Sequence, residues 1–333
     1  MKQRTHTWLA IRAIALLDDT GAAPDLVKLL KPHVKGAAIG SWIPDLADSK
    51  KGTGDIDNHV FKIKPYTGPG PGRFVKNKQK TLQSLGPQRL MPQFIRDWGG
   101  ILDADWWATP YKANPTPGEH LANRAMALTT TLIDQLILGE PKVAALVPGT
   151  VRFASNLHPN ARTRAEEVAT YFFMLSHFVA DACQPMHCDA RRMAGYSNGV
   201  HKQLEGHWNM RVGTYFEKKK LFENTDSSNT ILNKARVVDQ SINITFGDVV
   251  PDLIARDTWL EMLSVCRSSF AISSILVPPS KIAYNSTKHT TFNAVFKGPA
   301  VDSTLLGELD KVVLHDAVLN IAMVWREVWK TFD

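Results

Sequence analysis

The chain has 333 residues, of which 44% are hydrophobic, 21% are charged and 9% are aromatic. A chain of this length and apolar content can bury a large core, which excludes a wholly disordered protein. The formal net charge of +7 suits polyanionic partners such as nucleic acid or an anionic membrane surface, although basic runs are also ordinary on a solvated face. The three cysteines, Cys183, Cys188 and Cys266, are odd in number and form no CxxC pair. This excludes a disulfide framework and favours small buried side chains.

The start of the chain reads MKQRTHTWLAIRAIALLDD and places basic residues before a short apolar run. Asp18 and Asp19 close this run, and no small-residue cleavage site follows it. No stretch of the chain approaches the ~20 apolar residues that a membrane-spanning helix needs. The sequence therefore predicts neither a signal peptide nor a transmembrane segment. It leaves open an intracellular protein, an effector exported by another route, or a mature form with a start methionine added.

The first third of the chain begins with helical patterns and then becomes loop-like. Apolar residues at helical spacing predict a helix over 6–20, with Gly21 as its stop. A short second helix is predicted over 24–31. From 35 to 66 glycines and prolines favour a loop, and the alternating Gly and Pro residues of 66–72 predict irregular structure.

Further along the chain helical patterns resume, and alternation of period two is scarce. We therefore predict an all-α protein, with helices over 85–98, 119–138, 160–183, 199–217, near 246–275, and 303–331. Between them we expect an aromatic-bearing loop at 101–118, a polar stretch after 220 and a loop near 277–302.

The most informative stretch, LSHFVADACQPMHCDARRMAGYSNGVHKQLEGHW, runs from 175 to 208. It contains His177-x3-Asp181-x5-His187 and, further on, His201-x3-Glu205. Because residues four apart lie on one face of a helix, the two side chains of each His/carboxylate pair can bind the same metal ion. Imidazole nitrogen and carboxylate oxygen without thiolate is the ligand mix of catalytic rather than structural zinc. An enzyme is therefore the leading interpretation.

Two simpler interpretations of these residues compete with the metal site. A lone histidine on an apolar face is usually a core residue, but His177 is followed one turn later by Asp181, and buried carboxylates are costly without a cation. A non-catalytic protein that uses zinc for stability is the alternative from another class, yet structural sites are typically closed and cysteine-rich. His207 and Trp208 are predicted to pack or to support the ligands rather than to bind metal.

These motifs resemble those of the bacterial zinc-dependent phospholipase C family and, more distantly, the S1/P1 nucleases, which use three zinc ions on a helical fold. The family's H-x3-D-x5-H run matches His177, Asp181 and His187, and His201 and Glu205 fill the positions that follow in the phospholipase branch. The Asn-Leu-His and Trp-Asp ending of the nuclease branch is absent. The resemblance implies one phospholipase C/P1 nuclease-like multi-helix domain over 1–333, with long loop insertions and a family-atypical insertion at about 62–160.

The resemblance extends to the N-terminal region. HTWLAIRAIALL at 6–17 is similar to the family's first helix, and GSWIPDL at 40–46 and NHVF at 58–61 resemble segments that supply an aspartate and a histidine. Asp48, Asp55 and Asp57 are nearby rivals, but only Asp45 combines the family spacing with a preceding proline. The implied ligand sets are Asp45, His59, His177 and Asp181 for one zinc; His187, His201 and Glu205 for a second; and His6 with the bridging Asp181 for a third.

Two departures from the family bear on these expectations. In the family the third zinc also takes the amine of an N-terminal tryptophan; here Met1 stands five residues before His6, as in the nuclease branch, and Lys2 hinders methionine removal. Met1 is therefore expected to supply the backbone amine. The aromatic residues that cage choline in the best-known phospholipases are replaced by Leu46 and Ile56, which disfavours a preference for choline.

The resemblance implies a phosphodiesterase of lipid degradation, which hydrolyses phospholipids to diacylglycerol and a phosphorylated headgroup by attack of zinc-bound hydroxide. Asp45 is expected to bind metal and to orient or deprotonate the water. The alternative is an S1/P1-type single-strand nuclease and 3′-nucleotidase on the same metals. In that branch a base-binding phenylalanine directly follows the histidine, whereas here Val60 intervenes before Phe61. Trp106, Trp107 and Phe61 could stack on a base or enter a lipid surface, and ordinary packing is the alternative for Trp106 and Trp107. A monomer is expected.

Overall fold

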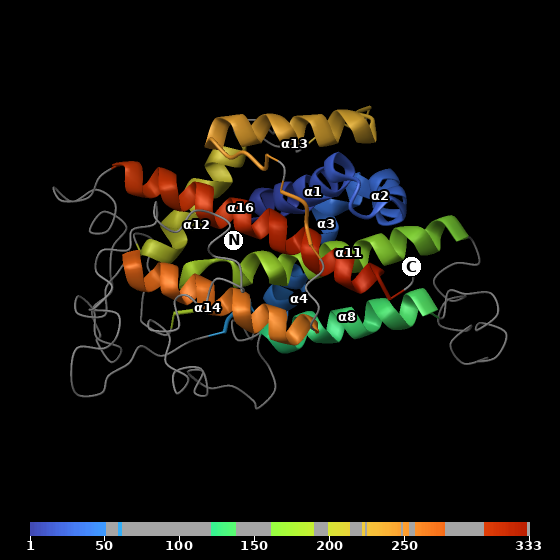
Figure 1. The fold of residues 1–333 in the computed structure, drawn as a ribbon, viewed down its shortest axis with the longest axis horizontal. Coiled ribbons are helices and arrows are strands. Elements are labelled where there is room, and N and C mark those ends of the chain that lie inside the picture. The colour runs from blue at the N-terminus through green and yellow to red at the C-terminus, as the bar shows by residue number, and fades with distance from the viewer. Residues whose placement is uncertain are drawn as a thin grey trace.

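The computed structural model describes residues 1–50, 59–61, 121–137, 161–189, 199–213, 222–223, 225–247, 249–252, 257–276 and 303–331. Within these ranges the chain is helical and no β-strand occurs, so the predicted all-α class is confirmed. In Figure 1 the long helices run roughly along the long axis of the molecule, and α12 crosses them. The helices are α1 (Gln3–Thr20), α2 (Pro24–Leu30), η1 (Lys31–Gly36), α3 (Ala37–Gly40), α4 (Ile43–Lys50), α8 (Leu121–Ile137), α11 (Ala161–Ala182), η5 (Pro185–His187), α12 (Val200–Gly213), α13 (Ser228–Ile242), α14 (Thr258–Leu276) and α16 (Ser303–Trp329).

Helix α1 lies at the centre of the described structure, where α3, α11, α12, α13 and α16 all pack against it. Every residue from Thr5 to Leu17 is buried, so the helix is enclosed on all sides rather than amphipathic. It ends where the sequence predicts, because Gly21 adopts a left-handed conformation with φ of 62°, which glycine reaches without a steric penalty. This enclosure places the chain start inside the molecule.

Helix α11 carries the central part of the predicted metal motif and packs on α3, α8 and α16. Its contact with α3 is very close: a Cβ atom on Gly40 would lie 2.7 Å from the Cβ of Phe173. Only glycine permits that approach. As a result the backbone of Ser41, which follows α3, reaches the side chains of α11.

The structure differs from the sequence predictions at three places. The loop predicted over 35–66 contains α3 and α4, whose Pro44 stands in the first turn, where its missing N–H is not needed. Helix α13 was missed because its polar start suggested a loop, yet the Ser227 side chain accepts a hydrogen bond from the backbone N–H of Thr230 and so caps the helix. The helix predicted near 246–275 begins only at Thr258, where the Asp257 carboxylate accepts the N–H of Leu260.

The remaining predicted helices match those observed over 121–137, 161–182, 200–213 and 303–329 within a few residues. The three cysteines are buried and free, as expected. None of the helices in the described ranges has the length and apolar character to cross a membrane. The helix predicted at 85–98, the loops at 101–118 and 277–302, Trp106, Trp107, and most of the insertion at 62–160 lie outside the described residues.

Candidate metal centre

All eight predicted ligand side chains converge in one buried region, although they come from six separate segments. His6 comes from α1, Asp45 from α4, His59 from the short segment before Val60, and His187 from η5. Helix α11 contributes His177 and Asp181, and helix α12 contributes His201 and Glu205. Their donor atoms form three groups, each with its atoms within 4.8 Å of one another: His6, Asp45 and His177; His59, His177 and Asp181; and His187, His201 and Glu205.

The pair on α11 organises the first side of the centre. His177 and Asp181 stand one helical turn apart, and the His177 Nε2 lies 3.2 Å from an Asp181 carboxylate oxygen. The His59 Nδ1 lies 2.9 Å from the same His177 nitrogen and 3.1 Å from Asp181. Asp45 adds an oxygen 3.7 Å from the His177 Nε2 and 3.8 Å from the His59 Nδ1. These are the four residues expected to share one ion.

The pair on α12 forms the second side of the centre with His187. The Nε2 atoms of His187 and His201 lie 2.9 Å apart. One Glu205 oxygen lies 2.9 Å from the His201 Nε2 and 3.3 Å from the His187 Nε2. The prolyl turn after α11 brings about this meeting, since it redirects the chain so that His187 faces α12. The three residues expected to share a second ion are therefore in contact.

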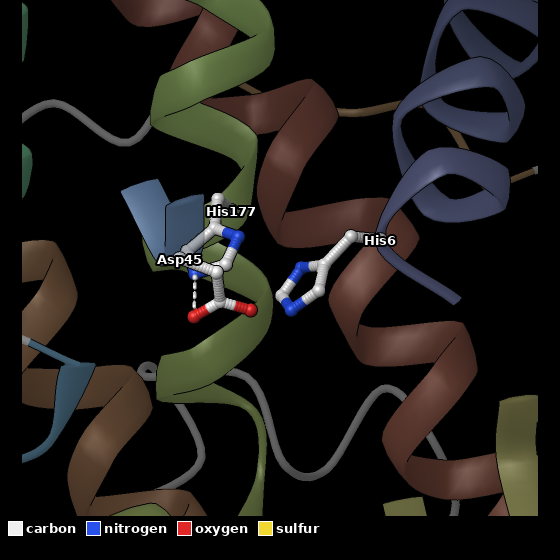
Figure 2. Close-up of side chains that lie close together, drawn as sticks. All are labelled: His6, Asp45 and His177. Carbon is white, nitrogen blue, oxygen red and sulfur yellow. Dashed lines mark ion pairs between the residues drawn. The ribbon is translucent and has the colours of Figure 1, made fainter. Parts of the chain in front are cut away.

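The N-terminal end of the chain lies between these two sides. The Met1 nitrogen is 2.8 Å from Asp181 and 3.0 Å from Glu205. The His6 Nε2 lies 3.5 Å from the same Asp181 oxygen, and the His6 ring stacks on His177 with 4.0 Å between centroids. Figure 2 shows His6, Asp45 and His177 pointing into one space from three helices. Asp181 thus contacts both sides of the centre, as the expected bridging role requires.

Backbone carbonyls orient two of the imidazoles. The Nδ1 of His177 lies 2.7 Å from the carbonyl oxygen of Ser41, and the Nδ1 of His187 lies 2.9 Å from that of His59. An imidazole that donates Nδ1–H to a carbonyl keeps the lone pair on Nε2. Both Nε2 atoms face the centre, which is the arrangement of metal-binding histidines.

The donor set fits a metal cation. Both ring nitrogens of His6 are buried without a hydrogen-bond partner, which is costly for a polar group. Two imidazole nitrogens that meet at 2.9 Å, as in His187 and His201, can share at most one proton, whereas a metal accepts both lone pairs. No cysteine belongs to the three groups, so the mixture of nitrogen and oxygen matches catalytic rather than structural zinc.

The protonation states also suit metal binding. Burial alone would raise the pKa of Asp181, but the Met1 ammonium, His187 and His177 outweigh it and hold the pKa well below its ordinary value. Burial acts likewise on Glu205, where the Met1 ammonium and His201 hold the pKa well below its usual range. Metals bind the ionised form of carboxylates, and that form is favoured here.

The imidazoles and the amine complete this charge balance. Burial, together with repulsion from His177 and the Met1 ammonium, holds the pKa of His6 well below its ordinary value, and burial lowers that of His187 to about 4. Burial would also lower the pKa of the Met1 amine, but Asp181 and Glu205 raise it to about 11. The neutral forms of His6 and His187 are therefore favoured, and the Met1 ammonium is the cation that lies beside the two carboxylates.

Asp45 differs from the other two carboxylates of the centre. Its side chain is 30% exposed, against 2% for Asp181 and 16% for Glu205. Burial, assisted by the charge of Asp181, raises the pKa of Asp45 above its ordinary value despite the neighbouring histidines. Asp45 is thus the carboxylate of the centre that is most open to solvent and most ready to take a proton.

Sequence reasoning did not find two groups that support the centre. One is the Ser41 carbonyl, which the close packing of Gly40 on Phe173 brings to His177; a backbone atom leaves no sequence signal. The other is Asp310, which binds His207 and Trp208 just beyond Glu205. Phe61, the ring considered as a base-stacking candidate, is 5% exposed and packs in the core.

Comparisons of the chain with protein-family models, with curated proteins and with solved structures find no match. The resemblance to the phospholipase C and S1/P1 nuclease motifs therefore stays a prediction. The geometry of the centre is the observation on which a functional proposal can be built.

Proposed function

We propose that this chain is a zinc-dependent phosphodiesterase of the phospholipase C type, which hydrolyses phospholipids to diacylglycerol and a phosphorylated headgroup. The observation that carries the proposal is the convergence of eight nitrogen and oxygen ligands from six segments around Asp181. Asp45, His59, His177 and Asp181 would hold one ion, and His187, His201 and Glu205 a second. His6 and Asp181 would hold a third, and the Met1 amine, whose pKa is raised to about 11 by the two carboxylates, would join them after giving up its proton.

Zinc ions at these ligands would lower the pKa of a bound water from ~15.7 to about 7 and attract the phosphodiester anion. The chain's own contribution is to place a partly exposed proton acceptor beside that water. Asp45, the carboxylate of the centre most open to solvent, suits this role of general base. The neutral His6 and His187 hold no proton that would have to leave before binding. No nucleophilic side chain is required, so the proposal includes no covalent enzyme intermediate.

Two features favour lipid over nucleic acid as the substrate. Glu205 stands where the phospholipase branch carries glutamate. In the nuclease branch the base-binding ring directly follows the histidine, but here Val60 occupies that position, and Val60 and Phe61 are only 6% and 5% exposed. The described segment after His59 therefore offers no open ring face for a base.

The decisive experiment assays zinc-loaded protein side by side on phospholipid vesicles of several headgroups and on single-stranded DNA and RNA. We expect release of diacylglycerol from vesicles and its loss in His177→Gln. The matched control is His315→Gln, because His315 is equally buried but lies outside the centre. Nucleotide release without diacylglycerol would favour the nuclease alternative. Zinc-loaded protein that cleaves neither substrate would overturn the proposal.

A further inference from the structure

A second buried carboxylate, Asp310, binds the helix that carries two of the metal-centre residues. Asp310 lies on α16 and its side chain is completely buried. Its carboxylate accepts hydrogen bonds at 2.8 Å from the Trp208 Nε1 and at 2.7 Å from the Arg211 guanidinium, and it lies 2.8 Å from the His207 Nε2. A second Arg211 nitrogen donates to the Ser241 carbonyl at 2.8 Å. One carboxylate thus binds three side chains of α12.

Two of the three partners of Asp310, His207 and Arg211, lie on a different side of α12 from His201 and Glu205, whereas Trp208, seven residues after His201, lies beside them. Successive residues of an α-helix are about 100° apart, so His207, Trp208 and Arg211 centre on a direction roughly a quarter turn from His201 and Glu205. The hydrogen bonds from Asp310 to these side chains resist rotation of α12 about its own axis. Such a rotation would carry His201 and Glu205 away from His187, to which they are 2.9 Å and 3.3 Å distant.

Besides these bonds, the Asn209 side chain of α12 accepts a hydrogen bond from the backbone N–H of Arg4 at 3.2 Å, and α12 packs on α1 and α13. The buried residues of α12 are mainly one apolar row formed by Val200, Leu204, Trp208 and Val212, while Met210 is 66% exposed. Apolar contacts are non-directional, whereas hydrogen bonds to an ionised carboxylate are short and directional. A buried carboxylate is also costly unless its acceptors are satisfied. The position of Asp310 is therefore coupled to its three donors.

We propose that Asp310 is a positioning residue, which holds α12 at the rotation that keeps His201 and Glu205 at metal-binding distance from His187. The inference rests on the proposed metal-dependent function and deepens it. Asp310 touches neither the expected metals nor the substrate. Hydrogen bonds that orient metal ligands directly typically contribute about 10- to 100-fold to metal affinity, which sets the scale for a residue that orients two ligands through their helix.

The test uses the full chain with Zn²⁺ alone as the probe and measures stepwise affinity by competition with a chelator. The Zn²⁺-binding step that Glu205→Gln weakens is assigned to the ion held by His187, His201 and Glu205. We expect Asp310→Asn to weaken that same step by about 10- to 100-fold and to leave the other steps unchanged. The matched control is Asp316→Asn, the same substitution at a buried carboxylate of the same helix, which should bind zinc like the wild type.

A second readout separates positioning from a general loss of stability. With Co²⁺ in place of zinc, the visible absorption bands report ligand geometry, and Asp310→Asn should shift the bands of the step that Glu205→Gln weakens. If Asp310→Asn does not fold, Arg211→Met replaces it, because Arg211 is 32% exposed and its removal leaves Asp310 with two of its three partners, while the bond to the Ser241 carbonyl is lost as well. There we expect a weaker effect, about 3- to 10-fold.

The outcomes separate the two proposals. Wild-type protein that binds no zinc overturns both the metal-dependent function and the positioning role. Wild-type protein that binds zinc, together with a folded Asp310→Asn variant of unchanged affinity and unchanged cobalt spectrum, overturns the positioning role alone. An unchanged Arg211→Met variant would do the same where Asp310→Asn does not fold.

Discussion

Two buried histidine–aspartate pairs of this protein behave in opposite ways. His177 and Asp181, on α11, are four residues apart, and their side chains meet at 3.2 Å. His315 and Asp316, on α16, are adjacent in sequence and 3.7 Å apart. Burial is nearly the same, yet the pKa of Asp181 is held well below its ordinary value while burial raises that of Asp316 well above it. The surroundings thus favour the ionised form of Asp181 and the protonated form of Asp316.

The difference lies in the surroundings rather than in residue type. Side chains four apart on a helix converge on one face, whereas adjacent side chains diverge by about 100°. Asp181 also meets the Met1 ammonium, His59 and His187 from other segments. Its negative charge is therefore neutralised, while burial is the cause that acts on Asp316. A His/carboxylate pair can take part in a metal centre only where other segments bring further nitrogen and oxygen donors to the same point.

The largest expected effect comes from making the same substitution in both pairs. Asp181→Asn removes the bridging ligand and should lower kcat/KM on the hydrolysed substrate by roughly 10³-fold or more, because several kcal/mol of charge stabilisation are lost with the metals. Asp316→Asn replaces a carboxyl whose protonated form is favoured by burial with a neutral side chain of the same shape, and it should leave kcat/KM and zinc content unchanged. Equal losses in both variants would remove the distinction between the pairs.

The next effect concerns the pH dependence of stability. Burial, with repulsion from Arg12, lowers the pKa of His315 to about 4 from an ordinary value of 6.5. Between these values the unfolded chain binds a proton that the folded chain does not, so His315 makes the free energy of unfolding fall as the pH drops from 6.5 towards 4. Integration over this window gives a contribution of about 2 to 3 kcal/mol.

His315→Gln should abolish that contribution. Urea unfolding of metal-free protein at pH 7 and pH 4.5, with chelator present, measures the change for both proteins. We expect the wild type to lose about 2 to 3 kcal/mol more than the variant. Identical losses would mean that His315 is charged in the folded protein, and the contrast with the metal centre would then rest on Asp316 alone.

The smallest effect tests the cation that distinguishes the two pairs. Addition of Gly-Ser before Met1 converts its amine to an amide and removes the positive charge between Asp181 and Glu205. If the amine is a metal ligand, the affinity of one zinc ion should fall about tenfold, and activity should fall with it. An extended protein with unchanged zinc affinity and activity would exclude the amine as a ligand.

The sequence predicts much of this centre, but by two different routes. Helical spacing alone pairs His177 with Asp181 and His201 with Glu205, because residues four apart share a helix face whatever the tertiary fold. His6, Asp45 and His59 carry no such local signal, and only the resemblance singles them out. The structure brings all of them together, although Asp45 lies on a helix where a loop was predicted.

The fold was predicted well where helices are long and apolar, and poorly where polar residues begin them. Helices α8, α11 and α16 follow their hydrophobic patterns closely. Helix α13 was missed although its apolar residues recur at helical spacing, because Ser227 and its neighbours suggest a loop until the serine is recognised as a cap. Helices α3 and α4 are too short to form by propensity alone, and packing on α11 stabilises them.

The sequence by itself determined the all-α class, the donor chemistry of the centre and the two His/carboxylate pairs, because these depend on composition and on the pitch of a single helix. Only the tertiary structure decided that the Ser41 carbonyl orients His177 and that Asp310 binds α12. These contacts join residues far apart in the chain, and no local pattern encodes them. They depend on how closely whole helices approach, which packing against the common core sets.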